Sequence, residues 1–252
     1  MRCWAPPFPE RSRVPSDASS RGASEVLAAF AAATQSGNAF DEALRTAAAR
    51  LSAARMVLEA PTATSERARR ALASNGGGLR RAFVAATVLA GTPATRSDAA
   101  TIAATLAAGE AAGAGDTAIV EAIAIGREVT ARVRVAVALD EPWDAEAVAD
   151  RIGAAIAAAR IAQLDANQIR HALGLAATQA AGLGVAQGTA AGELTFGKAA
   201  FDAVEGAALA RAGFTSAPAS LEGRRGLAAL MAHGFDEAAL REGLGQQWIS
   251  AL

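Results

Sequence analysis

The chain has 252 residues, which fits one large domain or two small ones and is long enough to bury a core. Hydrophobic residues make up 52% of it but aromatic residues only 4%, and alanine, the best helix former, supplies the bulk of the rest, so the composition favours closely packed helices. The formal net charge of -1 gives no electrostatic reason to expect nucleic acid or an anionic membrane as a partner, and the single cysteine, Cys3, excludes an internal disulfide and a cysteine-built metal site, so a reducing cytoplasm is the expected compartment.

The first segment, residues 1–22, is rich in proline, arginine and serine and has no continuous apolar run. We interpret it as a disordered leader or a misassigned start, not as a signal peptide. Residues 23–252 are predicted to form a single all-helical domain, because helical periodicity recurs and no window alternates with period two long enough to demand a sheet. Turn residues bound the first predicted helices, at 24–34, 39–60, 64–74, 79–90 and 97–112.

The clearest amphipathic helix begins at Asp116, which we expect to be its N-cap. Its predicted buried stripe consists of Ile119, Ile123, Gly126, Thr130, Val133 and Val137. Glu121, Glu128 and Arg132 fall on the opposite face, and Glu128 and Arg132 have the spacing of an i,i+4 ion pair.

Two further helices are predicted to begin near Asp144 and Asp165. Asp165 followed by Gln168 resembles a capping box. The predicted buried face of this second helix is Ile169, Leu173, Ala176, Ala180 and Leu183. His171 lies opposite that face, so we expect it to be solvated. Later helices are predicted at about 198–212 and 236–243, with His233 in a turn between them.

The longest uncharged stretch, residues 172–192, has the length of a membrane span but carries five glycines and two glutamines. We interpret it as a tightly packed segment of a soluble protein. The following residues, Gly192 to Lys198, fit most of a phosphate-binding P-loop. Ala199 stands where the Mg²⁺-binding hydroxyl should be, and no strand precedes the loop, which argues against nucleotide binding.

Lys198 is the only lysine of the chain and follows a glycine-rich stretch. A lysine held there could pair a substrate carboxylate or act as a base if it were desolvated. The alternative is a solvated lysine at a helix start. Asp144 and Glu146 also have two interpretations. They could be catalytic, or they could only interact favourably with the helix macrodipole, as acids in a first helical turn do.

Three stretches resemble the MmgE/PrpD family, which includes 2-methylcitrate dehydratase, cis-aconitate decarboxylase and iminodisuccinate epimerase. The first is His171-Ala-Leu-Gly-Leu-Ala-Ala-Thr-Gln-Ala-Ala-Gly-Leu183, the second is Glu128-Val-Thr-Ala-Arg-Val133, and the third combines Ala210 to Thr215 with Leu221 to Gly226. The resemblance implies an all-α, multi-helix bundle similar to the family's large helical domain. It also implies a dimer and a cofactor-independent site between this domain and a smaller α/β domain, near whose expected start the sequence ends.

The family's chemistry is proton abstraction beside a carboxylate, which needs a positioned base and cationic clamps. Three motifs of the family are altered in this sequence. The Asp-Asp-Thr turn corresponds to Gly91 to Thr95, and Trp-His-Pro-Thr corresponds to Trp143-Asp144-Ala145-Glu146. Thr-Lys-Arg-Leu-His-Pro-Gly corresponds to Ala191 to Gly197, which keeps only the leucine and the glycine, and Lys198 is not the equivalent of the family's lysine.

Two hypotheses follow. The chain is either a diverged, non-catalytic module that forms a homodimer or a heteromer with a full-length relative, or a cofactor-independent lyase or isomerase that acts on a small carboxylic acid. For the enzyme, the candidate catalytic residues are Asp144, Glu146 and Lys198, and the candidate substrate-binding residues are Arg151 and Thr195. No cofactor and no metal site is predicted, because no histidine or cysteine has a partner at metal-ligand spacing.

Overall fold

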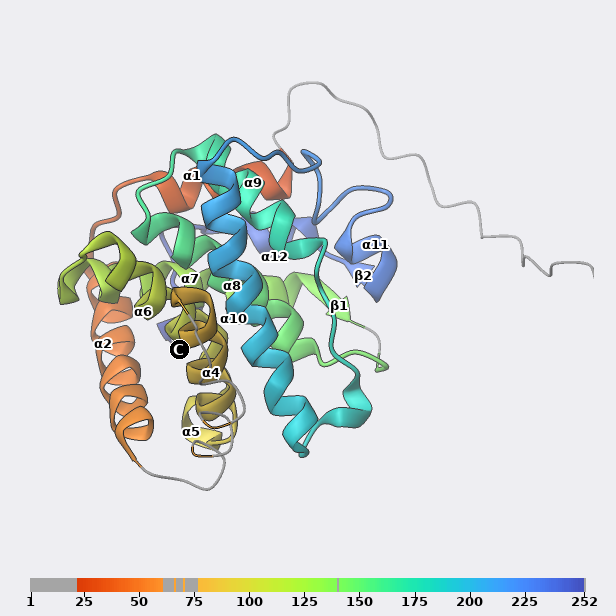
Figure 1. Cartoon of the computed structure of the whole chain (residues 1–252). Coiled ribbons are helices and arrows are strands. Elements are labelled where there is room, and N and C mark those ends of the chain that lie inside the picture. The colour runs from red at the N-terminus through yellow and green to blue at the C-terminus, as the bar shows by residue number, and fades with distance from the viewer. Residues whose placement is uncertain (1–21, 61–65, 67–69, 71–76, 140, 252) are drawn as a thin grey trace, which may run out of the picture.

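The computed structural model describes residues 22–60, 66, 70, 77–139 and 141–251 of the chain. Within these residues the architecture is all-α, as the composition predicts (Figure 1). The predicted leader, apart from Gly22, and the predicted helix at 64–74, apart from Glu66 and Arg70, lie outside the described residues. The longer helices are α1 (Ala23–Ala32), α2 (Asn38–Glu59), α4 (Gly78–Ala90), α6 (Ala99–Ala112), α7 (Asp116–Ala136), α8 (Ala145–Ile161), α9 (Ala166–Ala177) and α10 (Ala190–Arg211).

Short elements join the long helices and complete the C-terminal part. They are α5 (Pro93–Arg96), β1 (Val137–Leu139), η1 (Gly184–Ala186), α11 (Leu227–Met231), β2 (Ala232–Phe235), α12 (Glu237–Arg241) and η2 (Ile249–Ala251). The two strands pair antiparallel, with Val137 opposite Phe235 and Ala138 opposite Gly234. This small sheet was not predicted, and it places His233 in a strand and not in a turn.

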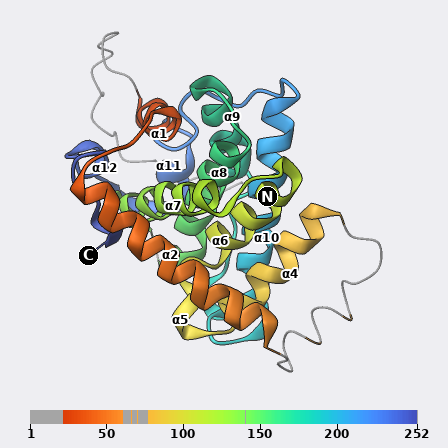
Figure 2. The same cartoon turned by 90° about the vertical axis from the view of Figure 1, so that its left-hand side faces the viewer.

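The centre of the bundle is α8, which packs against α6, α7, α9 and α10, while α2 lies obliquely across the outer side of α7 (Figures 1 and 2). Nearly every residue of α8 from Ala147 to Ile161 is buried, and half of the buried residues are alanine. The closest approach is between Gly153 of α8 and Gly126 of α7. A Cβ atom at Gly126 would lie 2.8 Å from the Gly153 carbonyl oxygen, so glycine is required for the two backbones to touch.

The predicted stripe of α7 is buried, but its opposite face is not solvated as expected. Glu128 and Arg132 do form the predicted i,i+4 ion pair, at 2.6 Å, yet they are 0% and 1% exposed. The reason is that the C-terminal segment covers them: Arg132 donates to the carbonyl oxygens of Glu242 and Gln247, both at 2.7 Å, and the Ser250 amide donates to Glu128. Helix periodicity cannot reveal that a distant segment will cover a polar face.

Several helix ends follow the predicted signals. Asp144 caps α8 through the amide of Ala147, and Asp165 and Gln168 form a complete capping box at α9. At α7 the N-cap is Gly115, and Asp116 is instead the first helical residue, in an ion pair with Arg55.

The second half of the predicted α9 face is wrong, because the helix ends at Ala177. Ala180 and Leu183 follow the helix, and Leu183 is 58% exposed. His171 is half-buried and not solvated, since its Nδ1 accepts the backbone amide of Ser216 at 3.0 Å. Burial, aided by the charge of Arg170, lowers the pKa of His171.

Residues 190–198, which include the near match to a P-loop, are helical. Helix α10 begins at Ala190, eight residues before the predicted start, with Thr189 as its N-cap. The near match to a P-loop therefore lies within a helix, whose backbone amides are committed to helical hydrogen bonds after the first turn. No helix in the described part of the chain has the length and apolarity needed to cross a membrane.

Candidate functional site

Arg96, at the end of α5, is the centre of a polar cluster that also contains two of the predicted catalytic residues. Its Nε donates to Glu146 at 3.0 Å and its Nη2 donates to Asp144 at 3.2 Å. The third nitrogen, Nη1, donates to the carbonyl oxygen of Ala90 at 3.3 Å. The guanidinium group also lies over the ring of Phe196, 4.6 Å from its centroid, which is a favourable cation–π contact.

The local sequence explains how the side chain of Arg96 is positioned. Pro93 at the start of α5 is well suited to a first helical turn, because its φ angle is already fixed. Arg50 of α2 then holds the turn on both sides of Arg96, donating to the carbonyl oxygen of Ala94 at 2.5 Å and to the hydroxyl of Ser97 at 2.9 Å. Arg96 is therefore fixed by its own contacts and by those of its neighbours.

The two acids differ in how freely they could act on a substrate. Asp144 is 1% exposed, and its two carboxylate oxygens contact Arg96 and the Ala147 amide. Glu146 is 27% exposed, and its second oxygen lies 3.9 Å from Arg134. Asp144 is thus a helix cap and an ion-pair partner, while Glu146 alone reaches solvent.

The turn that precedes α10 closes the cluster on one side. Trp143 and Leu183 form an isolated antiparallel bridge, and the Asp144 amide donates to the Gly182 carbonyl oxygen at 2.9 Å. Gly182 has φ +139°, and a Cβ atom there would lie 2.7 Å from the Thr195 methyl group and 3.5 Å from Asp144. Thr195 therefore packs at this turn, beside Asp144, and its hydroxyl donates to Ala191.

Residues 86–239 match the MmgE/PrpD N-terminal domain. The chain belongs to the MmgE/PrpD family. No curated protein matches it. The match covers the three sequence stretches that carry the resemblance and all of the polar cluster around Arg96.

The three stretches that the resemblance aligns with family motifs lie at this cluster or next to it. Arg96 directly follows the 91–95 stretch, Asp144 and Glu146 belong to the second, and Thr195 and Phe196 belong to the third. Where the resemblance implies a base and carboxylate clamps, this chain has an arginine whose charge is already balanced by two acids.

The other two predicted site residues, Arg151 and Lys198, lie elsewhere. Both contact Asp202, which is buried, and Arg151 is 0% exposed while Lys198 is half exposed. Arg151 is two helical turns beyond Asp144, about 10 Å along the axis of α8. Lys198 is two residues after Phe196, so it leaves α10 on the opposite side from the ring that supports Arg96.

The surroundings of Arg151 are unusual for a cation. Burial lowers its pKa, and the charge of Asp202 opposes that shift. Its Nε and Nη2 atoms have no hydrogen-bond partner within the described residues. Sequence alone does not predict these surroundings, because nearly all of α8 is buried, including its charged residues Asp150 and Arg151.

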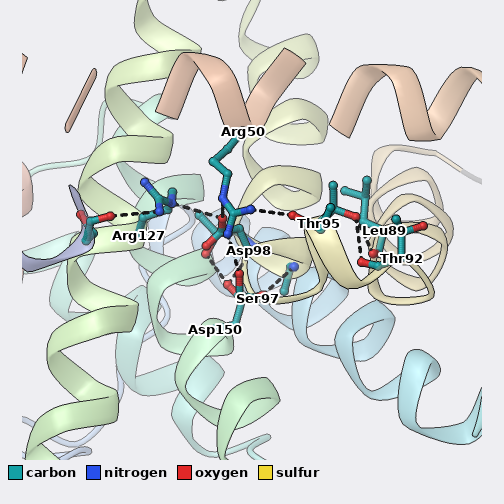
Figure 3. A network of polar contacts seen from close by, with 12 residues as sticks. Arg50, Leu89, Thr92, Thr95, Ser97, Asp98, Arg127 and Asp150 are labelled. Atoms are coloured by element: carbon teal, nitrogen blue, oxygen red, sulfur yellow. Dashed lines mark hydrogen bonds and ion pairs between the residues drawn. The ribbon is translucent and has the colours of Figure 1, made fainter. Parts of the chain in front are cut away.

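A second polar network lies at the start of α6 (Figure 3). Asp98 contacts Arg50 at 2.8 Å and Arg127 at 3.2 Å, and Arg127 also donates to the Ser250 carbonyl oxygen. Asp150 of α8 accepts the amides of Ala100 and Thr101. Burial raises the pKa of Asp150 to about 8, against the lowering effect of its hydrogen bonds.

The sequence singles out Asp144 and Glu146, which the structure brings together at Arg96, but it does not single out Arg96, Arg50 or Asp98. Arg96 could have been found, because it is the only basic residue directly after the altered 91–95 turn. The roles of Arg50 and Asp98 depend on contacts between helices far apart in the sequence, which no local pattern encodes. Among the described residues, no group of three or more His, Cys, Asp or Glu side chains could hold a metal ion.

Proposed function

We propose that this chain is a non-catalytic member of the MmgE/PrpD family that acts as an assembly module, pairing with a second copy of itself or with another member of the family. The observation that carries the proposal is the occupation of the cluster by its own ion pairs. A general base must be free to reach a substrate proton, and Asp144 is instead a buried cap bound to Arg96.

The cationic groups that could bind a substrate carboxylate are also already paired. A substrate carboxylate would have to compete with Asp144 and Glu146 for the guanidinium group of Arg96, because both acids are already bound to it. Lys198, the other candidate clamp, is bound to Asp202 and directed away from the cluster.

Assembly is supported by apolar side chains left on the surface. The exposed large hydrophobic residues include Val185, at 88%, and Leu230, at 70%, together with Met56, Val135, Leu183, Leu194 and Phe214. Single exposed apolar residues are ordinary in a monomer, but this number in an alanine-rich chain favours a partner that covers some of them.

The test is a turnover assay with the purified chain on 2-methylcitrate, cis-aconitate and related small carboxylic acids. We expect no turnover above that of a sample carrying Glu146→Gln. The matched control is Glu141→Gln, which alters an exposed acid nearby. Turnover that is lost with Glu146→Gln and kept with Glu141→Gln would contradict the proposal.

One observation favours the second function, a cofactor-independent lyase or isomerase. Glu146 is partly exposed and lies beside the cation of Arg96, so a carboxylic acid that displaced it from Arg96 would have a carboxylate base close by. The same assay decides between the two functions, since only the enzyme requires Glu146 for turnover.

A further inference from the structure

A groove with two cationic and two aromatic side chains lies between α4 and α10. Its volume is about 300 Å³, and it is lined by Arg80 and Phe83 of α4 and by Lys198 and Phe201 of α10. The helices cross closely here because residue 197 is glycine: a Cβ atom would lie 2.8 Å from the Phe83 carbonyl oxygen. The four lining side chains stand beside this crossing and form the walls of the groove.

The groove has more positive charge than its acid can balance. Lys198 lies over the ring of Phe201, 5.3 Å from its centroid, and contacts Asp202. Asp202 is also the partner of the buried Arg151, whose Nε and Nη2 lack a hydrogen-bond partner within the described residues. One carboxylate therefore serves two cations.

Arg80 adds a second uncompensated charge. Its side chain is exposed, and across the described ranges it has no hydrogen bond or ion pair, whereas the adjacent Arg81 pairs with Glu110 at 3.1 Å. Lys198 contributes an ammonium group with three donors, of which Asp202 takes one.

We propose that this groove binds a small organic anion with a flat apolar body, such as an aromatic carboxylate. Arg80 and Lys198 bind the anionic group, and the rings of Phe83 and Phe201 pack against the apolar body. An inorganic anion would leave the aromatic walls unused, and a cation would be repelled. The groove is on the opposite side of α10 from Phe196, so this inference does not depend on the proposed function.

The test is isothermal titration calorimetry with 2-naphthoate as the probe, compared with the neutral 2-naphthamide and with acetate. We expect saturable binding of 2-naphthoate and binding at least about tenfold weaker for each of the other two, because each lacks one half of the recognition. Arg80→Gln should weaken 2-naphthoate binding about tenfold, whereas the control Arg81→Gln should leave it within about twofold.

Phe201→Leu separates the aromatic wall from the charges, and it should weaken 2-naphthoate and leave acetate unchanged. Thermal melts show that each variant is folded before it is titrated. The proposal is overturned if 2-naphthoate does not saturate, if 2-naphthamide binds equally well, or if Arg80→Gln and Arg81→Gln weaken binding to the same extent.

Discussion

Arg96 binds two acids, a carbonyl oxygen and an aromatic ring, and each contact depends on the planar shape of the guanidinium group. Removing it would leave Asp144 buried without its cation. We expect Arg96→Gln to lower the free energy of unfolding by about 2 kcal/mol, below the value for a fully buried pair because Arg96 is 22% exposed.

Urea denaturation measures this change. The matched control is Arg134→Gln, which removes the longer and more exposed contact to Glu146 and should cost less than about 0.5 kcal/mol. Equal losses in both variants would show that Arg96 has no special structural role.

The raised pKa of Asp150 makes the stability of the protein depend on pH. Its pKa is about 8 in the folded protein and near 3.8 in the unfolded chain, so between these values only the folded protein holds the proton. Folding then takes up a proton, and the free energy of unfolding contributed by this residue falls as the pH rises from about 4 to about 8. The groups around it are Asp98, which raises the pKa further, and Arg50 and Arg127, which are paired with Asp98.

Asp150→Asn isolates this contribution. The variant should be less stable at low pH, because an amide cannot accept both the Ala100 and Thr101 backbone amides, but it should lose less stability than the parent between pH 5 and pH 8. Urea denaturation at several pH values measures both curves. Parallel curves would mean that Asp150 is ionised throughout.

Among the elements, those with strong end signals could be predicted from the sequence. Asp144, Asp165 and Asp236 stand at predicted helix starts and cap their helices, since a side-chain oxygen satisfies amides that the helix itself leaves free. The start of α10 could not be predicted, because its glycines indicate a loop. Gly192 is accommodated in the first turn of α10 because the preceding turn packs closely against it: a Cβ atom there would lie 2.5 Å from the Ala186 carbonyl oxygen.

The crossing of α7 and α8 gives a prediction about packing. Gly153→Ala should lower the free energy of unfolding by about 2 kcal/mol, because the new methyl group would strike Thr130 and the Gly126 backbone, although alanine is the better helix former. Gly78→Ala is the control, since its nearest contact is the Ala107 carbonyl oxygen at 3.9 Å. Thermal or urea denaturation of both variants measures these changes. A Gly153→Ala variant with an unchanged free energy of unfolding would contradict the close crossing.

The packing of the C-terminal segment on α7 gives a further prediction about stability. Arg132→Met removes the donor to three backbone carbonyl oxygens and leaves Glu128 buried without its cation, so we expect a loss of about 3 kcal/mol. Hydrogen exchange should also become faster in residues 240–250. An exposed pair serves for comparison, and Arg45→Met, which breaks the contact with Glu42, should change neither quantity.

At the scale of the whole molecule, the polar networks join parts of the chain that the sequence presents separately. Arg50 of α2 links the turn around Arg96 to Asp98, and Arg127 continues from Asp98 to Ser250 near the C-terminal end of the described chain (Figure 3). The family and the helical class could be predicted from motifs and composition. The cluster around Arg96 could not, because it depends on which helices pack together.

The mass of the purified chain in solution tests most directly our claim that the protein acts by assembly and not by catalysis. Light scattering at micromolar concentration should give twice the mass of one chain, or the mass of a mixed complex when another member of the family is added. A mass of one chain under both conditions would contradict the claim.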